Sequence, residues 1–164
     1  MYQKAKLATL LASMLIAALA LTGCTVSRVS GEGGAAVPTE KAADGDSEGL
    51  VIPMSELDGD AHFYTADLDG AKIGVIAVKL ADGSVRTAFN ACQVCFDSGK
   101  GYFEQEGDEL VCQNCGTRFG MDQVGLSAGG CNPVPIRETD RQESASALTV
   151  PLSTLHRAAS LFPN

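Results

Sequence analysis

The amino-acid sequence predicts a small, mainly β domain with two metal-binding cysteine loops and a short C-terminal helix, preceded by a signal peptide and a flexible tether. Three observations predict this fold class. Asp-Gly dipeptides separate short runs of strand-forming residues. Five of the six cysteines lie between Ala88 and Pro133, four of them in two Cys-x-x-Cys pairs. Apolar residues at helical spacing follow Pro151 near the C-terminus.

The N-terminal residues have the features of an export signal. Lys4 and Lys6 precede an apolar run over 7–21, and small residues then lead directly to Cys24. The alternative is a transmembrane helix, but the apolar run is short for a bilayer span. We therefore predict a lipoprotein signal peptide over 1–23 and lipidation at Cys24, which would anchor the protein in the cell membrane on its extracytoplasmic face.

Residues 24–49 are rich in Gly, Ser, Ala and charged residues, and this composition predicts a flexible tether. A single metal-binding domain is expected over 50–164. Removal of the signal takes away two of the twelve basic residues and none of the twenty acidic ones, so the net charge becomes 10 − 20 = −10. Nucleic acid is therefore excluded as a partner, and an anionic membrane surface is disfavoured.

Three strands are predicted over 61–68, 71–80 and 84–90, because Asp69-Gly70 and Asp82-Gly83 separate them and both dipeptides favour type I′ hairpin turns. The middle run is apolar on both faces and should be a central strand. Its two faces carry Ile73, Val75 and Ala77 on one side and Ile76 and Val78 on the other. The third run leads the chain to Cys92.

A further hairpin is expected from 102–105 and 109–112, and it leads to Cys112. Beyond Cys131, we expect an exposed polar segment over 137–147, an edge strand over 148–150 and a helix that begins at Pro151. The similarity of Ile52-Pro53-Met54-Ser55-Glu56-Leu57 to Val150-Pro151-Leu152-Ser153-Thr154-Leu155 predicts two similar transitions from strand to turn.

The two cysteine pairs, Cys92 with Cys95 and Cys112 with Cys115, have the spacing of a metal site. Two such turns that face each other provide four thiolates in a tetrahedron, which suits zinc or iron. The alternative is a pair of disulfides, which an exported domain would permit. Gly116 favours the metal-binding turn, because glycine readily adopts positive φ. His62 and His156 are expected to be ordinary surface or packing residues.

Cys131 is a fifth thiol on a glycine-rich loop. It is a candidate metal ligand, and it could instead exchange with a disulfide partner or lie buried as a free thiol. The signal has no twin arginine, so the chain should be exported unfolded, and a cluster assembled in the cytoplasm would not survive that route. Zinc, or iron acquired after export, is favoured on this ground.

Several motifs surround the cysteines, namely 85–95, Gly99-Lys100-Gly101-Tyr102, Glu106-Gly107-Asp108, Val111-Cys112-Gln113-Asn114-Cys115-Gly116, Arg118-Phe119 and Gly129-Gly130-Cys131-Asn132-Pro133. In these motifs the sequence resembles the FtrD-like family of membrane iron–sulfur proteins, from about residue 50 to 136. A more distant similarity is to Rieske-type and zinc-ribbon domains, in which two metal-binding loops face each other.

The resemblance implies an iron or iron–sulfur protein at the outer face of the membrane and, as in some relatives, an electron-handling accessory in iron uptake. The expected partner is then a membrane protein of iron transport or redox chemistry, and the chain is an accessory rather than an enzyme. Longer relatives place membrane spans before the domain, where this chain has the predicted lipid anchor. Two alternatives are a structural zinc-binding module and a thiol-disulfide redox protein, although no helix is expected after either cysteine pair to activate a thiol.

Overall fold

The computed structural model describes residues 41–42 and 49–162. The predicted signal peptide 1–23, the predicted lipidation site Cys24 and most of the predicted tether 24–49 lie outside the described residues. Of the described tether residues, Lys41–Ala42 form the short strand β1 and Gly49 begins strand β2. Within these described ranges, the model contains no helix of the length and apolar character needed to cross a membrane.

The fold is mainly β, as predicted, and its largest sheet has five strands in the order β1-β3-β4-β5-β9. Strand β1 pairs with β3 in parallel, and the other neighbours are antiparallel. Strand β4 is the central strand of this sheet, as its two apolar faces predict. The remaining strands of this sheet are β3 (His62–Leu68), β4 (Ala71–Lys79), β5 (Val85–Cys92) and β9 (Pro133–Pro135).

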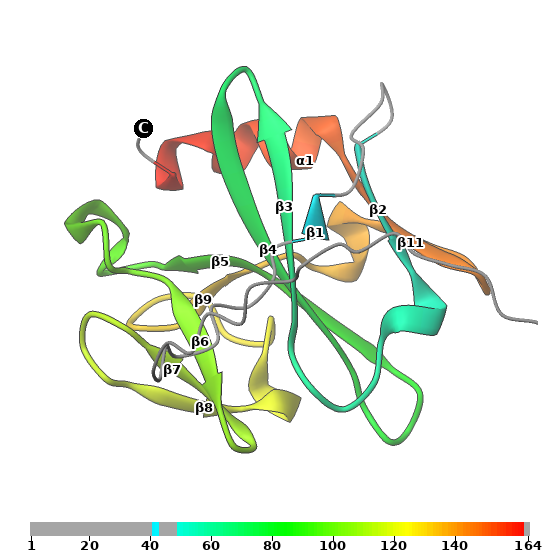
Figure 1. Cartoon of the computed structure of the whole chain (residues 1–164), viewed down its shortest axis with the longest axis horizontal. Helices are drawn as coiled ribbons and strands as arrows, with labels where there is room; N and C mark the ends of the chain where they lie inside the picture. The colour runs from blue at the N-terminus through cyan, green and yellow to red at the C-terminus, as the bar shows by residue number, and fades with distance from the viewer. Residues whose placement is uncertain (1–40, 43–48, 163–164) are drawn as a thin grey trace, which may run out of the picture. The chain divides into compact units, whose positions relative to one another are not determined.

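Two three-stranded sheets complete the β structure (Figure 1). One has the order β10-β11-β2, with β10 at Gln142–Glu143, β11 at Ala147–Pro151 and β2 at Gly49–Pro53. The other has the order β6-β7-β8, with β6 at Phe103–Glu106, β7 at Glu109–Cys112 and β8 at Arg118–Gly120. The helix α1 (Leu152–Ala158) follows β11. Five 3-10 turns also occur in the described residues, at Met54–Glu56, Phe96–Ser98, Met121–Gln123, Glu138–Asp140 and Ala159–Leu161.

The central strand β4 contributes side chains to two separate hydrophobic cores. The first core contains Ile73, Val75 and Ala77 of β4 together with Leu50, Ile52, Leu57, Tyr64, Ala66, Leu68, Val85, Phe89, Ile136, Leu148, Val150, Leu155 and Ala158. The second core contains Ile76 and Val78 of β4 together with Ala88, Cys92, Cys95, Phe103, Leu110, Cys112, Met121 and Val124. Because alternate residues of a strand point to opposite faces, β4 separates a core without cysteine from a core that holds three.

The two Asp-Gly turns differ from each other. Asp69 and Gly70 have φ of 52° and 86° and directly connect the paired residues Leu68 and Ala71, as expected for type I′. The prediction of type I′ at Asp82-Gly83 was wrong, because only Gly83 has positive φ there, at 87°. The Asp82 carboxylate accepts hydrogen bonds from the Ser84 amide and hydroxyl, at 2.9 and 2.6 Å, and these bonds hold a longer turn.

Two predictions about the C-terminal part were wrong. Residues 148–150 were expected at a sheet edge, but β11 lies between β10 and β2 because the preceding segment folds back as β10. That segment is also not wholly exposed. Arg141 is only 8% exposed, and its guanidinium donates to the Thr87 hydroxyl and to the Val85 carbonyl oxygen.

The two similar six-residue segments do form similar transitions, as predicted. Strand β2 ends at Pro53 and leads into a 3-10 turn, and β11 ends at Pro151 and leads into α1. The two strands also pair with each other in antiparallel orientation. Beyond α1, Phe162 packs against Phe89 with ring centroids 6.4 Å apart, so the C-terminal segment closes the first core.

Candidate metal centre

The first cysteine turn follows the end of β5. Cys92 is the last residue of that strand, and its amide donates to the Gly101 carbonyl oxygen at 2.6 Å. The Cys95 amide donates to the Cys92 carbonyl oxygen at 3.2 Å, which closes the turn. A 3-10 turn of three residues, Phe96–Ser98, follows at once, and no α-helix directly follows either cysteine pair in the described part of the domain.

The second cysteine turn follows the end of β7 and repeats this arrangement. The Cys112 amide donates to the Thr117 carbonyl oxygen at 3.0 Å, and the Gly116 amide donates to the Cys112 carbonyl oxygen at 2.8 Å. Gly116 has φ of 71°, which is the conformation that its position after Cys115 predicted. Each turn therefore begins at a strand end and is closed by backbone hydrogen bonds.

The segment that begins at Gly101 holds the two turns together. The Gly101 carbonyl bonds to the first turn, and the next carbonyl, that of Tyr102, accepts from the Gln113 amide of the second turn at 2.9 Å. Phe103 then pairs with Cys112 in the β6–β7 ladder. The Phe103 amide also donates to Oδ1 of Asn90, two residues before Cys92, at 2.7 Å. The relative position of the two cysteine pairs is thus set by both backbone pairing and one side-chain bond.

The four cysteines of the two pairs converge as predicted. The Sγ atoms of Cys92, Cys95, Cys112 and Cys115 all lie within 4.8 Å of one another. None of the five described cysteines forms a disulfide, so the disulfide alternative has no support in this structure. Cys92, Cys95 and Cys112 are buried in the second core, whereas Cys115 is exposed.

The protonation of these thiols depends on their surroundings. Burial raises the pKa of Cys92 to about 12 and also raises that of Cys112. The hydroxyl of Thr117, 3.2 Å from the sulfur of Cys115, lowers the pKa of Cys115 to about 6, and the Thr117 amide adds to this effect. The site therefore combines buried thiols that require a cation to ionise with one exposed thiol that ionises readily.

Backbone N–H groups also point at the buried sulfurs. The sulfur of Cys92 accepts from the amides of Val94 and Cys95, and the sulfur of Cys112 accepts from the amides of Asn114 and Cys115. Such bonds stabilise the negative thiolate that a metal ion requires as ligand. The donor set is four thiols with oriented N–H groups and no carboxylate among them, and it fits iron or zinc.

Cys131 lies at the margin of this group. It is half-buried and packs against the second core, and its side chain adds a small part to the lowering of the pKa of Cys115. Two hydrogen bonds of Gln93 connect its loop to the first turn. The backbone N–H of Gln93 donates to the Asn132 carbonyl oxygen, and the side-chain Oε1 of Gln93 accepts from the backbone N–H of Gly129. The predicted fifth thiol is therefore adjacent to the four, on their exposed side.

The other candidate residues lie away from the cysteines. His62 contacts the carboxylate of Asp58 at 2.8 Å, and His156 is exposed on α1. Neither belongs to the cysteine group. Two residues that position the site were not predicted, Asn90 and Thr117. Thr117 could have been identified from the sequence, because it is a hydroxyl residue two positions after Cys115. The bond between Asn90 and the Phe103 amide could not, because it depends on a contact between two sheets.

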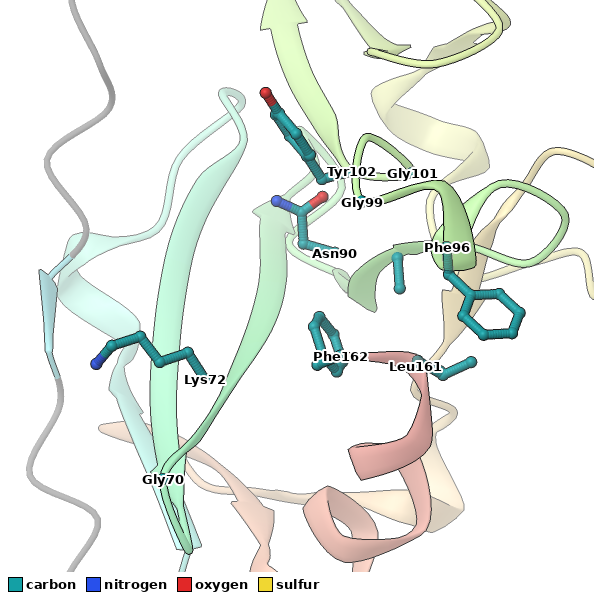
Figure 2. Close-up of a pocket in the computed structure, with 10 residues that line it drawn as sticks. Gly70, Lys72, Asn90, Phe96, Gly99, Gly101, Tyr102, Leu161 and Phe162 are labelled. Carbon is teal, nitrogen blue, oxygen red and sulfur yellow. The ribbon is translucent and has the colours of Figure 1, made fainter. Parts of the chain in front are cut away.

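A cavity of about 390 Å³ adjoins the back of the first cysteine turn. Figure 2 shows Asn90, Tyr102 and Phe96 around it, with Leu161 and Phe162 entering from the C-terminal segment. The one charged group of its lining, Lys72, extends away from the Phe162 ring and pairs with Asp67 at 3.5 Å. The cavity is therefore mainly apolar and brings no further metal ligand to the site.

Comparison with protein families gives one match. The family described as membrane iron-sulfur containing protein FtrD-like matches residues 57–162, which is 106 of the 164 residues. The matched range begins after β2, includes all five cysteines of the described domain, and extends to Phe162, well beyond the motifs that end near residue 136. No curated protein and no solved structure matches the chain.

Proposed function

The chain belongs to the FtrD-like family of membrane iron–sulfur containing proteins, and we propose that it is a lipid-anchored, extracytoplasmic iron protein that exchanges single electrons. Its expected setting is a membrane system for iron uptake or a related redox reaction, in which it serves as an accessory to a membrane partner. One observation carries the proposal, namely that four thiols from two separate turns converge within 4.8 Å.

Iron at this site would supply one-electron chemistry between its ferric and ferrous states. The chain contributes the ligands Cys92, Cys95, Cys112 and Cys115. The amides that point at the sulfurs of Cys92 and Cys112 offset the negative charge of the thiolates. All-thiolate ligation favours a lower reduction potential than mixed histidine and cysteine ligation. The two turns are held by strands and by mutual hydrogen bonds, which keeps the ligand geometry nearly constant between oxidation states.

The exposed side of the site is where electrons would enter and leave. Three of the four sulfurs are buried, and only Cys115 is exposed. Val94, between the cysteines of the first turn, is 59% exposed. An exposed ligand on one turn and an exposed apolar residue on the other are suited to brief contact with a redox partner. We assign Cys131, which contacts Cys115, as a reserve thiol that can replace it at the metal.

Attachment to the membrane is proposed through Cys24, after removal of residues 1–23, with residues 24–49 as the tether and 50–164 as the metal domain. The sequence pattern of lysines, apolar run and small residues before Cys24 supports this arrangement. The chain would then face the extracytoplasmic side of the cell membrane.

The metal is tested by expressing the full chain with its signal, extracting it with detergent and without chelator, and measuring metal content together with the visible spectrum. We expect iron and visible absorbance that disappears on reduction or chelation. Stoichiometric zinc without colour would exclude the electron-transfer role. Metal-free protein with oxidised cysteines would contradict the proposal that the domain binds a metal ion.

The anchor is tested separately with Cys24→Ala. We expect the unchanged protein to incorporate labelled fatty acid and to sediment with membranes, and the variant to do neither while still binding metal in its domain. Cys131→Ala is the matched control, because it removes a cysteine outside the predicted lipidation site and should leave membrane attachment intact. Membrane attachment of the Cys24 variant would show that another part of the chain is the anchor.

A structural zinc module is the second candidate, favoured by the place of Cys92, Cys95 and Cys112 inside the second core. Zinc in such a position contributes folding energy and no redox chemistry. In that case the exposed face around Val94 would serve partner recognition alone. The metal analysis above distinguishes the two candidates directly.

A further inference from the structure

The distances among the four sulfurs limit how many metal atoms can lie between them. Four thiolates bound to one ion at about 2.3 Å are about 3.8 Å apart in a tetrahedron. In a cluster, the cysteines bind different iron atoms, so some sulfur pairs are separated by two such bonds plus an iron–iron gap, which exceeds about 5 Å. The observed limit of 4.8 Å for every pair fits the first case and not the second.

The contacts between the two turns point the same way. The sulfurs of Cys92 and Cys112, which come from different turns, lie within 4.8 Å of each other. In a cluster, inorganic sulfide and a second iron would lie between ligands of different irons. A separation of at most 4.8 Å between the sulfurs of the two turns leaves no room for those extra atoms.

The turns are also not free to separate. The segment that begins at Gly101 bonds to both turns, and the bond from Asn90 to the Phe103 amide ties β5 to β6. Cys92, Cys95 and Cys112 pack against the second core. To admit several iron atoms, these hydrogen bonds would break and part of that core would open.

We propose that the four cysteines hold one metal ion in a tetrahedral all-thiolate site without inorganic sulfide. This inference rests on the proposed metal-binding role of the four cysteines. In the iron form, the iron–sulfur character of the protein would then consist of cysteine sulfur alone. Such a site needs no cluster assembly before export, because a single ion can bind after the chain has crossed the membrane.

Reconstitution tests the inference. The detergent-extracted full chain is stripped of metal, reduced, and incubated anaerobically with ferrous iron, in parallel samples with and without inorganic sulfide. We expect one iron per chain in both samples and no acid-labile sulfide after desalting. Two or four irons per chain with matching labile sulfide, formed only when sulfide is supplied, would overturn the inference.

A cobalt titration gives a second readout that does not depend on iron. Cobalt in a tetrahedral thiolate site absorbs strongly in the visible, and we expect its absorbance to saturate at one equivalent. Saturation at two equivalents would overturn a single-ion site. Cys131→Ser should keep the end point of one equivalent, because four thiols remain, whereas the double variant Cys115→Ser/Cys131→Ser, which leaves three thiols, should weaken cobalt binding by tenfold or more.

The outcomes separate this inference from the proposed function. One zinc per chain in the purified protein, with a cobalt end point of one equivalent, would support the single-ion site and contradict the role in electron transfer. A multi-iron cluster would do the reverse, since it would support electron transfer and contradict the single-ion site.

Discussion

Cys115 differs from the other three thiols of the site in both access and acidity. It is exposed, and the hydroxyl of Thr117 lies 3.2 Å from its sulfur. The three other thiols are buried among apolar side chains. The chemical behaviour of the metal-free site is therefore expected to be dominated by one residue, although four residues form it.

We predict that Cys115 is alkylated faster than Cys92 and Cys112 in the reduced, metal-free protein. Its pKa is lowered to about 6, so the reactive thiolate is present above that pH and is lost as the pH falls through it. The rate should be nearly constant above about pH 7 and fall about tenfold per unit below pH 6. Iodoacetamide labelling resolved by peptide mass spectrometry measures this.

The variant Thr117→Val tests whether the Thr117 hydroxyl causes the lowered pKa of Cys115. Loss of the hydroxyl should move the pKa of Cys115 upward toward its ordinary value, so labelling at about pH 7 should slow several-fold. Thr139→Val, an exposed threonine elsewhere, is the control and should change nothing. Equal rates in both variants would show that the hydroxyl does not activate this thiol.

Gly101 is required for steric reasons. A Cβ at this position would lie 2.3 Å from the carbonyl carbon and oxygen of Cys95. We predict that Gly101→Ala lowers the free energy of unfolding by about 1–3 kcal/mol and weakens cobalt binding, because the first cysteine turn must move. Gly59→Ala is the control, since a Cβ there meets nothing within 4 Å, and it should stay within about 0.5 kcal/mol. Chemical denaturation and cobalt titration measure both.

At the scale of elements, short sequence patterns correctly predicted the strands and the cysteine turns that depend on nearby residues. The Asp-Gly dipeptides delimited β3, β4 and β5, and the apolar character of both faces of β4 identified it as central. The cysteine spacing predicted that the four sulfurs converge. Each of these features depends on neighbours within a few residues or on a spacing rule, and such features are readable from one sequence.

Features that depend on contacts between distant segments were not predicted. Strand β9 joins the edge of β5 across about forty residues of chain. Arg141 looked like part of a solvated segment, but it is buried because Thr87 and the Val85 carbonyl accept its hydrogen bonds. Asp82 was expected in a tighter turn, and its bonds to Ser84 decided otherwise. In each case, tertiary or side-chain bonding outweighed the local pattern.

The bond from Asn90 to Phe103 yields a prediction at this scale, because it is the side-chain link between β5 and β6. Asn90→Ala leaves the Phe103 amide without its acceptor in a half-buried place, at a cost of about 1–3 kcal/mol. We expect lower stability together with weaker cobalt binding. Gln142→Ala, an exposed amide on β10, should affect neither. A loss of stability with unchanged cobalt affinity would show that the bond does not position the site.

At the scale of the whole molecule, the central strand β4 separates two hydrophobic cores, and metal binding should stabilise these cores unequally. The first core contains no cysteine, and the second contains three. A structural zinc site contributes about 10–16 kcal/mol, which is comparable to the whole stability of a domain, about 5–15 kcal/mol. Metal should therefore matter much more to one face of the sheet than to the other.

We predict that chelation under reducing conditions opens the second core first. Amide hydrogen exchange should lose protection in the β6-β7-β8 sheet and in both cysteine turns, while β2 and β11 of the first core stay protected. Cadmium or zinc added back should restore protection. Simultaneous loss of protection in both cores would instead indicate one cooperative unit.

The exposure of Cys115 also determines the side from which a metal ion would enter or leave the site. A chelator or a competing protein would reach a bound ion from the side of Cys115, because the other three thiols lie inside the second core. We therefore expect dissociation to follow a fixed order, in which the bond to Cys115 opens before the buried ones. The lifetime of a bound ion would then depend mainly on how fast its bond to Cys115 opens, with Cys131 nearby to replace that ligand.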